Sequence, residues 1–272
     1  MRRSFATTTG EPSCAPTELG KQPGGGFQLL DLPSSEAVAR HAAELLLAAC
    51  LEQPRRPLGL ATGRTMTPIY AALVALVQEC PAKEQETLRS HWCSFNLDEY
   101  VGLGPEQAGS FATEMRLSIG QPLAIAPHQV HLPNGLAEDP EAEAIRYRDA
   151  LCKAGGVGLQ LLGLGLNGHV GFNEPPCAAN TTARCVQLSA STRRANASAF
   201  GGDPDGVPTR AITLGLAEIL EADRILLVVT GAAKAAVLRR LLDQPPSADL
   251  PASWLHQHPS VCLLADPAAL SG

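Results

Sequence analysis

The chain has 272 residues, of which 45% are hydrophobic and 18% charged, and its formal net charge is −6 at pH 7. This length suits one large α/β domain or two small ones, with enough apolar residues for a substantial core. Scattered lysines and arginines exclude the basic surface by which proteins hold nucleic acid, and no apolar run approaches the ~20 residues of a membrane span.

Residues 1–26 are rich in Thr, Pro, Ser and Gly, and we expect a disordered tail ahead of a single domain over 27–272. From residue 27 onward, apolar runs of strand length alternate with segments of helical apolar spacing. Strands are predicted at 27–32, 57–61, 91–100, 157–165, 182–188, 223–231 and 260–266, and helices at 34–53, 66–80, 140–155 and 232–244. The helix at 34–53 opens with a Ser cap.

Strands that are apolar throughout and alternate with amphipathic helices indicate a mostly parallel sheet with helices on both faces. The expected fold class is therefore α/β, a three-layer α/β/α sandwich with a Rossmann-like sheet. In such sheets ligands bind beyond the C-terminal ends of the strands. The loops that follow the strands are thus the first place to look for a functional site.

The first such loop is "GLATGRT" at 59–65, where Thr62, Gly63 and Thr65 lie between a strand and a helix. Backbone N–H groups there, aided by the helix dipole, can hold a phosphate. A glycine turn before a helix is also common for structural reasons. This one lacks both the Walker spacing and the GxGxxG pattern of a dinucleotide site. The turn alone is therefore either an anion site or a plain connection.

The second is "FNLDEY" at 95–100, in which Asp98 and Glu99 end a predicted apolar strand. Two adjacent acids usually mean one solvated side chain and one helix cap or ion pair. The functional alternative is a carboxylate base at the mouth of the site.

The third loop, "GLGLNGHVGFNEP" at 163–175, follows a buried strand and combines glycines with an imidazole and a carboxylate. Its glycines let the backbone approach a ligand closely. His169 is expected to titrate near neutrality, so that it can accept and donate a proton. Glu174 could orient that imidazole or take over its proton. A lone loop histidine is often a plain surface residue, but this combination favours catalysis.

Together these stretches resemble the glucosamine-6-phosphate deaminase (isomerase) family. The resemblance covers about residues 27 to 266, and the matching segments follow the family's order. The "FNxDE" and "GxNGHxGFNEP" elements are its specific parts. The matching segments are "LGLATGRT" (58–65), "FNLDEYVGL" (95–103), "GLGLNGHVGFNEP" (163–175), "STRRAN" (191–196), "VPTRAITLG" (207–215), "TGAAKA" (230–235) and "LHQHP" (255–259).

The resemblance implies conversion of an amino-sugar phosphate to fructose 6-phosphate and ammonia, without metal or organic cofactor. In the implied mechanism Asp98 moves a proton from C2 to C1 through an enolamine. His169 shuttles a proton during ring opening, and Asn167 and Glu174 hold that histidine. The implied phosphate-binding residues are Thr62, Gly63, Arg64, Thr65, Arg193 and Lys234.

Three positions depart from the family's best-known branch. Asn167 stands where that branch has Asp, so Glu174 is expected to carry more of the orienting role. Arg64 replaces a usually small residue and either adds a phosphate contact or points outward. Val186 stands where the allosteric hexamers tend to carry a lysine, and the chain stops at Gly272, soon after the last predicted strand. We therefore expect no such activation, and a monomer or homodimer.

Several alternatives stay open at this point. The chemistry could be that of a 6-phosphogluconolactonase-like hydrolase, which shares the sheet, or of a galactosamine-6-phosphate deaminase. A sugar-phosphate sensor would need a DNA-binding segment that residues 1–26 cannot supply. Asp98, Glu99, His169 and Glu174 could also hold a divalent ion.

The cellular setting is predicted from the cysteines and the N-terminus. The eight cysteines form no CxxC pair, so reduced core thiols are expected rather than disulfides or metal ligands. No hydrophobic segment follows Arg2 and Arg3, so we expect no secretory signal. The expected partner is a small hexosamine phosphate in the cytoplasm, with neither nucleic acid nor membrane involved.

Overall fold

The computed structural model describes residues 27–52 and 55–271. The tail expected at 1–26 lies outside the described residues. Within them, no helix is both long enough and apolar enough to cross a membrane.

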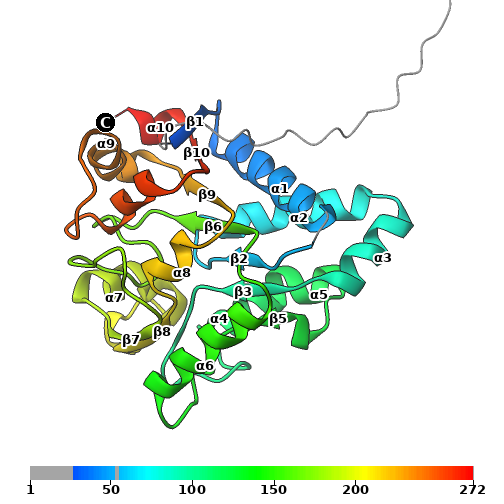
Figure 1. Cartoon of the computed structure of the whole chain (residues 1–272), viewed down its shortest axis with the longest axis horizontal. Coiled ribbons are helices and arrows are strands. Elements are labelled where there is room, and N and C mark those ends of the chain that lie inside the picture. Colours follow the sequence, from blue (N-terminus) through cyan, green and yellow to red (C-terminus); the bar gives the residue numbers. More distant parts are fainter. Residues whose placement is uncertain (1–26, 53–54, 272) are drawn as a thin grey trace, which may run out of the picture.

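A seven-stranded sheet, parallel throughout, forms the centre of the molecule (Figure 1). Its strand order is β1-β10-β9-β6-β2-β3-β5. The middle strands are buried apolar runs, as expected for a sheet with helices on both faces. The strands are β1 (Phe27–Asp31), β2 (Leu58–Leu60), β3 (Ser94–Asn96), β5 (Val130–His131), β6 (Leu159–Gly163), β9 (Arg224–Val229) and β10 (Val261–Ala265).

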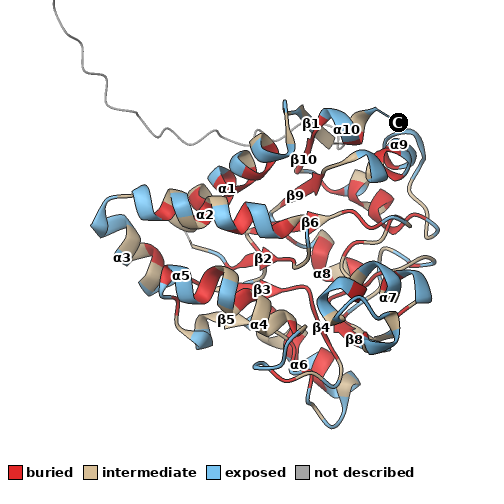
Figure 2. Ribbon diagram, turned by 180° about the vertical axis from the view of Figure 1, so that it is seen from behind, coloured by how far each residue is buried: buried red, intermediate tan, exposed pale blue. Residues whose placement is uncertain are grey.

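Helices cover both faces of this sheet, which confirms the α/β sandwich (Figures 1 and 2). α1 (Ser35–Leu51) and α2 (Met66–Glu79) pack together on one side, and α6 (Pro140–Lys153) and α8 (Leu216–Leu220) lie on the other. The predicted cap of α1 is present, because the Ser34 side chain accepts a hydrogen bond from Ala37 N–H. The remaining helices are α3 (Ala82–His91), α4 (Phe111–Met115), α5 (Gln121–Leu123), α7 (Ala190–Asn196), α9 (Ala235–Asp243) and α10 (Pro267–Leu270).

A second sheet of three antiparallel strands corrects two expectations. The strand predicted at 91–100 divides at Leu97 into β3 and β4 (Asp98–Tyr100), and β4 belongs to the second sheet. Leu97 bridges the sheets, because its N–H donates to Leu60 O (3.0 Å) and its carbonyl accepts from Leu214 N–H (2.8 Å). The other strands of this sheet are β7 (Arg184–Gln187), within the segment predicted at 182–188, and β8 (Arg210–Thr213), which was not predicted.

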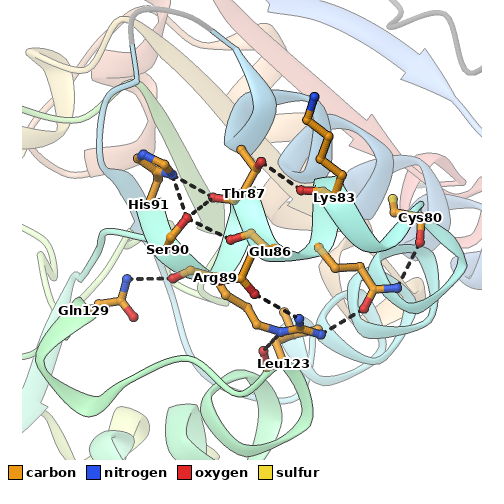
Figure 3. Close-up of polar contacts among 10 residues, drawn as sticks. Cys80, Lys83, Glu86, Thr87, Arg89, Ser90, His91, Leu123 and Gln129 are labelled. Atoms are coloured by element: carbon orange, nitrogen blue, oxygen red, sulfur yellow. Dashed lines mark hydrogen bonds and ion pairs between the residues drawn. The ribbon is translucent and has the colours of Figure 1, made fainter.

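Helix α3 was also not predicted, and Figure 3 shows the side chains that hold it in place. Leu88 is its one buried residue, so its sequence lacks the apolar spacing of a core helix. Arg89 donates to Leu123 O (3.2 Å) and to Gln85 Oε1 (2.9 Å). Gln129 Nε2 in turn donates to Arg89 O (2.8 Å). Polar contacts therefore tie α3 to its neighbours, at a distance from the loops discussed next.

Candidate active site

Two of the three loops singled out in the sequence meet beyond the end of β6. The carboxylate of Asp98, the first residue of β4, lies against the 163–175 loop. A methyl group on Gly171 would stand 3.3 Å from Asp98 Oδ2 and 3.3 Å from Thr213 Oγ1. Asp98 also accepts a hydrogen bond from the backbone of Phe172. The expected convergence of segments some seventy positions apart is therefore present.

The loop after His169 is fixed to the second sheet by buried hydrogen bonds. Phe172 N–H donates to Thr213 Oγ1 (3.3 Å). The side-chain amide of Asn173 donates to Val170 O and to Leu214 O, each at 3.0 Å. Because Thr213 is also the register partner of Asp98, β8 positions the carboxyl group and the loop together.

His169 is oriented by Asn167, as the resemblance implied. The side-chain amide nitrogen of Asn167 faces Glu174 Oε1 (3.4 Å), and a carboxylate can only accept, so the amide oxygen is the atom left for the imidazole. That oxygen lies 2.5 Å from His169 Nδ1. The neutral ring therefore carries its proton on Nδ1 and leaves Nε2 free to accept one.

The backbone at Gly165 explains why the loop is glycine-rich at this point. Gly165 N–H donates to His169 O (2.9 Å), which folds the loop back on itself. A Cβ atom on Gly165 would lie within 2.2 to 2.5 Å of atoms of the His169 ring. Only glycine leaves room for the imidazole in this position.

Glu174 is held by the first turn of α7. It accepts hydrogen bonds from the backbone N–H (3.0 Å) and hydroxyl (2.7 Å) of Ser189 and from the hydroxyl of Thr192. Burial raises the pKa of Glu174, but these hydrogen bonds outweigh it, so the pKa lies below its ordinary value. Glu174 is therefore an ionised anchor for Asn167 and, through it, for His169.

The protonation state of His169 differs from the expectation that it titrates near neutrality. The pKa of His169 is lowered to about 4. Burial is the main cause, Glu174 opposes the lowering, and Lys234 contributes to it. The Asn167 amide supplies no charge that would stabilise the imidazolium. The lowered pKa favours the neutral imidazole in the free protein at pH 7.

The two acids of "FNLDEY" have different partners. Glu99 accepts from Tyr100 N–H (2.8 Å) and, at the start of α4, from Phe111 N–H (3.1 Å) and Ala112 N–H (2.9 Å). Glu99 is thus the helix cap that two adjacent acids often include. Asp98 is not the solvated partner, since only 6% of it is exposed.

Burial raises the pKa of Asp98 to about 8, and the carboxylates of Glu99 and Glu114 add to the shift. A buried carboxyl group with a strongly raised pKa, held against a loop that carries a histidine, is typical of an acid–base site. A pKa raised to about 8 favours the protonated form of Asp98 at neutral pH in the free protein.

The turn at 62–65 connects β2 to α2. It contains one cation, Arg64, and a second, Lys234, lies near Arg64. Gly63 takes a positive φ of 101°, which glycine adopts without strain. Lys234 Nζ donates to Leu164 O (2.6 Å). Burial lowers the pKa of Lys234, and so does the nearby Arg64 guanidinium. Two cations that repel each other next to a glycine turn are suited to hold an anion between them.

A pocket of about 220 Å³ adjoins this turn. Arg64 and Thr65 line it from the turn, Thr230 from the end of β9, and Ser35 and Glu36 from the start of α1. Lys234 does not line it.

Comparison with known proteins identifies the family. Residues 33–263 match the family described as glucosamine-6-phosphate isomerases/6-phosphogluconolactonase. The chain belongs to this family. It is 39% identical to a glucosamine-6-phosphate deaminase of Geobacillus sp. (strain WCH70), over 90% of this chain and 95% of the relative. It is 40% identical to a glucosamine-6-phosphate deaminase of Shouchella clausii (strain KSM-K16), over 90% of this chain and 97% of the relative.

Solved structures of the isomerase/lactonase family have the same fold. A monomeric glucosamine-6-phosphate deaminase of the NagB superfamily superimposes with a TM-score of 0.84 at 37% identity, covering 90% of this chain and 99% of the other. A 6-phosphogluconolactonase from Leishmania guyanensis superimposes with a TM-score of 0.69 at 20% identity, covering 91% and 98%. The second likeness is one of fold alone.

Arg193 does not join the site as the resemblance implied. Its guanidinium donates to Pro204 O (2.8 Å), Val207 O (3.2 Å) and Asp205 Oδ1 (3.1 Å). These contacts use Arg193 to hold the 204–207 segment against α7. Among the described residues it makes no hydrogen bond to the 62–65 turn, because its donors are directed to that segment.

The structure also adds residues that the sequence did not single out. Glu114 of α4 accepts a hydrogen bond from Gly63 N–H (2.9 Å), which places a third carboxylate beside Asp98 and Glu99. Only contacts formed in the fold reveal it, since nothing in "FATEM" marks Glu114 as a functional residue. The divalent-ion alternative finds no support in residues 27–52 and 55–271, where no three His, Cys, Asp or Glu side chains are grouped as metal ligands.

Proposed function

We propose that the chain is a glucosamine-6-phosphate deaminase, which converts glucosamine 6-phosphate and water to fructose 6-phosphate and ammonia. One observation carries the proposal. A buried Asp98 carboxyl group lies against the loop that presents a neutral His169, whose Nε2 is free to accept a proton. The cations beside the glycine turn supply the remaining requirement, a site for the phosphate.

The phosphate lies against the 62–65 turn between Arg64 and Lys234. A dianion held there gives binding energy remote from the reacting carbons and keeps them in register with the acid and the base. Thr62 and Thr65 are the first and last residues of this turn. We do not assign Arg193 to this subsite.

Ring opening is the task of His169. Nε2 takes the proton of the C1 hydroxyl and returns it to the ring oxygen as the C1–O5 bond breaks, which gives the open-chain aldehyde. The imidazolium formed in between is stabilised by Glu174 through the Asn167 amide. The imidazole is neutral again at the end of the step.

Asp98 carries out the transfer between the carbons. The ammonium group on C2 lowers the pKa of the neighbouring Asp98 carboxyl group, so substrate binding itself favours the carboxylate. The carboxylate removes the C2 proton and delivers it to C1 through an enolamine, while one ammonium proton passes to O1, which leaves a hydroxyl group at C1 and an iminium at C2. Water then adds at C2, ammonia leaves, and the C2 ketone remains.

We infer three further properties from the same evidence. The family match over 33–263 spans strands of both sheets, which supports one domain over 27–272. Val186 offers no cation for an activator's phosphate, and the relative of known structure is monomeric, so we propose a monomer or homodimer. We also infer a cytoplasmic setting, since the proposed substrate is a phosphorylated sugar.

Ammonia release tests the proposal, with glucosamine 6-phosphate and galactosamine 6-phosphate assayed side by side. Asp98→Asn and His169→Gln each remove a proton-transfer group and are expected to lower kcat by about 100-fold or more. Equal ammonia release by wild type and Asp98→Asn would refute the base assignment. Hydrolysis of 6-phosphogluconolactone without ammonia release would favour the hydrolase alternative.

A further inference from the structure

Glu114 is a carboxylate placed at the turn that is expected to receive a phosphate. Its Oε1 accepts the Gly63 N–H at 2.9 Å. Gly63 is the residue of positive φ at the tip of that turn, so its N–H is one of the donors available to an anion. In the structure a side chain of the protein holds this donor.

The helix that carries Glu114 is fixed firmly to β4. Glu99 accepts Phe111 N–H and Ala112 N–H, and Ser110 caps the same helix by accepting Thr113 N–H (3.1 Å). Glu114 therefore reaches from the element that follows Asp98 to the turn that follows β2. Its contact with Gly63 joins the base and the phosphate turn.

The surroundings of Glu114 are negative. Asp98 and Glu99 face it from β4, and the Tyr70 and Tyr100 phenols lie near enough for its charge to raise their pKa values. Among the described residues no lysine or arginine forms an ion pair with Glu114. Burial raises the pKa of Glu114, and the Gly63 hydrogen bond opposes that shift.

We propose that Glu114 is an internal competitor of the substrate phosphate, which holds Gly63 N–H and sets the affinity of the turn for anions. A phosphate dianion at Gly63 must displace an ionised Glu114 or lie beside it, and like charges repel. A protonated Glu114 neither repels the phosphate nor binds Gly63 as strongly. The inference rests on the proposed role of the 62–65 turn as the phosphate subsite.

This arrangement predicts how anion affinity changes with pH. As pH rises through the raised pKa of Glu114, the carboxylate ionises and phosphate binding weakens. The weakening adds to any trend from phosphate's own ionisation, which is the same for every variant. The difference between wild type and a variant with a neutral side chain at 114 therefore isolates the contribution of Glu114.

The test measures binding of inorganic phosphate by calorimetry at pH 6, 7 and 8. Glu114→Gln keeps the size of the side chain and removes its charge, and Glu114→Ala frees Gly63 N–H. Glu106→Gln is the matched control, because it removes the same charge from an exposed position. We expect both 114 variants to bind phosphate roughly tenfold more tightly than wild type at pH 8, with a gain that never increases as pH is lowered, and the control to match wild type.

Two results would overturn the inference. One is phosphate affinity in both 114 variants that equals or falls below that of wild type at all three pH values. The other is an equal gain in Glu106→Gln, which would indicate a general charge effect. Ammonia release by wild type, measured in parallel, separates this inference from the proposed function. Phosphate binding with the expected pattern but no ammonia release would contradict only the function.

Discussion

His169 depends on a neutral neighbour for its orientation. Asn167 accepts from Nδ1 and donates to Glu174, so the ring is oriented without a full charge beside it. A carboxylate at position 167 would favour the imidazolium directly. The Asn167 amide therefore favours the neutral imidazole. Glu174 stabilises the imidazolium only indirectly, through its contact with Asn167.

Asn167→Asp is expected to raise the pKa of His169 by roughly one to three units from about 4. The pKa can be followed by NMR titration of the imidazole Cε1–H signal of His169 in wild type and variant. A second expectation follows in activity, because a raised pKa brings protonation of His169 into the assay range and slows ring opening at low pH. An unchanged His169 titration would show that the amide is not what keeps the ring neutral.

The raised pKa of Asp98 predicts how the reaction rate depends on pH. The group must be ionised to accept the C2 proton, and its pKa in the free protein is about 8. kcat/KM is therefore expected to fall about tenfold per pH unit as pH decreases below 8. kcat should decline only at lower pH, because the substrate ammonium lowers the pKa in the complex. Steady-state ammonia release between pH 5 and 9 measures both, and coincident profiles would contradict this role of the ammonium.

At the scale of elements, β8 is the strand that aligns the site. Thr213 is fully buried, and its hydroxyl accepts Phe172 N–H and donates to Leu214 O (3.0 Å). Its register partner in β4 is Asp98. The strand thus sets the position of the carboxyl group relative to the His169 loop.

Thr213→Val removes this hydroxyl with little change of shape. The loss is expected to destabilise the fold by about 1–2 kcal/mol and to lower kcat more than it changes KM, because the loop shifts relative to Asp98. Thermal unfolding and ammonia release measure the two effects. Thr209→Val, at an exposed position near the start of the same strand, is the control. A stability loss with unchanged kcat would show that Thr213 supports the fold alone.

The elements also show what could be predicted from the sequence. Continuous apolar runs and capped periodic helices, such as β9 and α1, were predicted to within a few residues. The division of 91–100 was not, because Leu97 is as apolar as its neighbours and only pairing separates β3 from β4. α3 lacks a buried stripe, so its polar contacts could not be anticipated.

The site, too, could be predicted from the sequence only in part. The motifs predicted that the segment of Asp98 and the 163–175 loop lie together, and the structure brings these two segments into contact. The implied role of Arg193 depended on side-chain direction, which the motif does not specify. The protonation states of Asp98 and His169 depended on burial, which is a property of the whole fold.

At the scale of the molecule, the buried carboxyl group is destabilising wherever it is ionised. The folded pKa of Asp98 lies above its ordinary value of 3.8, so its stabilising contribution is complete below about pH 4 and is lost as pH rises to about 8. Asp98→Asn is therefore expected to be more stable than wild type at pH 8 and to lose less stability between pH 4 and 8.

Thermal unfolding of both proteins across this range measures the difference. Each kcal/mol recovered should raise the midpoint by about 2–4 °C. Glu174→Gln is the contrasting variant, because the pKa of Glu174 lies below its ordinary value and its ionised form is the favoured one. If the unfolding midpoints of wild type and Asp98→Asn change with pH in parallel, ionisation of Asp98 does not destabilise the fold.

Leu97 is the one residue between β3 and β4, and this has a consequence for how the chain can vary. Successive strand residues point to opposite sides, so inserting or deleting one residue here would turn Asp98 toward α4 and present Glu99 to the histidine loop. Glu99 would lose its three backbone donors in the same event. Surface loops of this protein can tolerate changes in length, whereas this junction can tolerate none without exchanging the acid that performs the chemistry for the acid that anchors a helix.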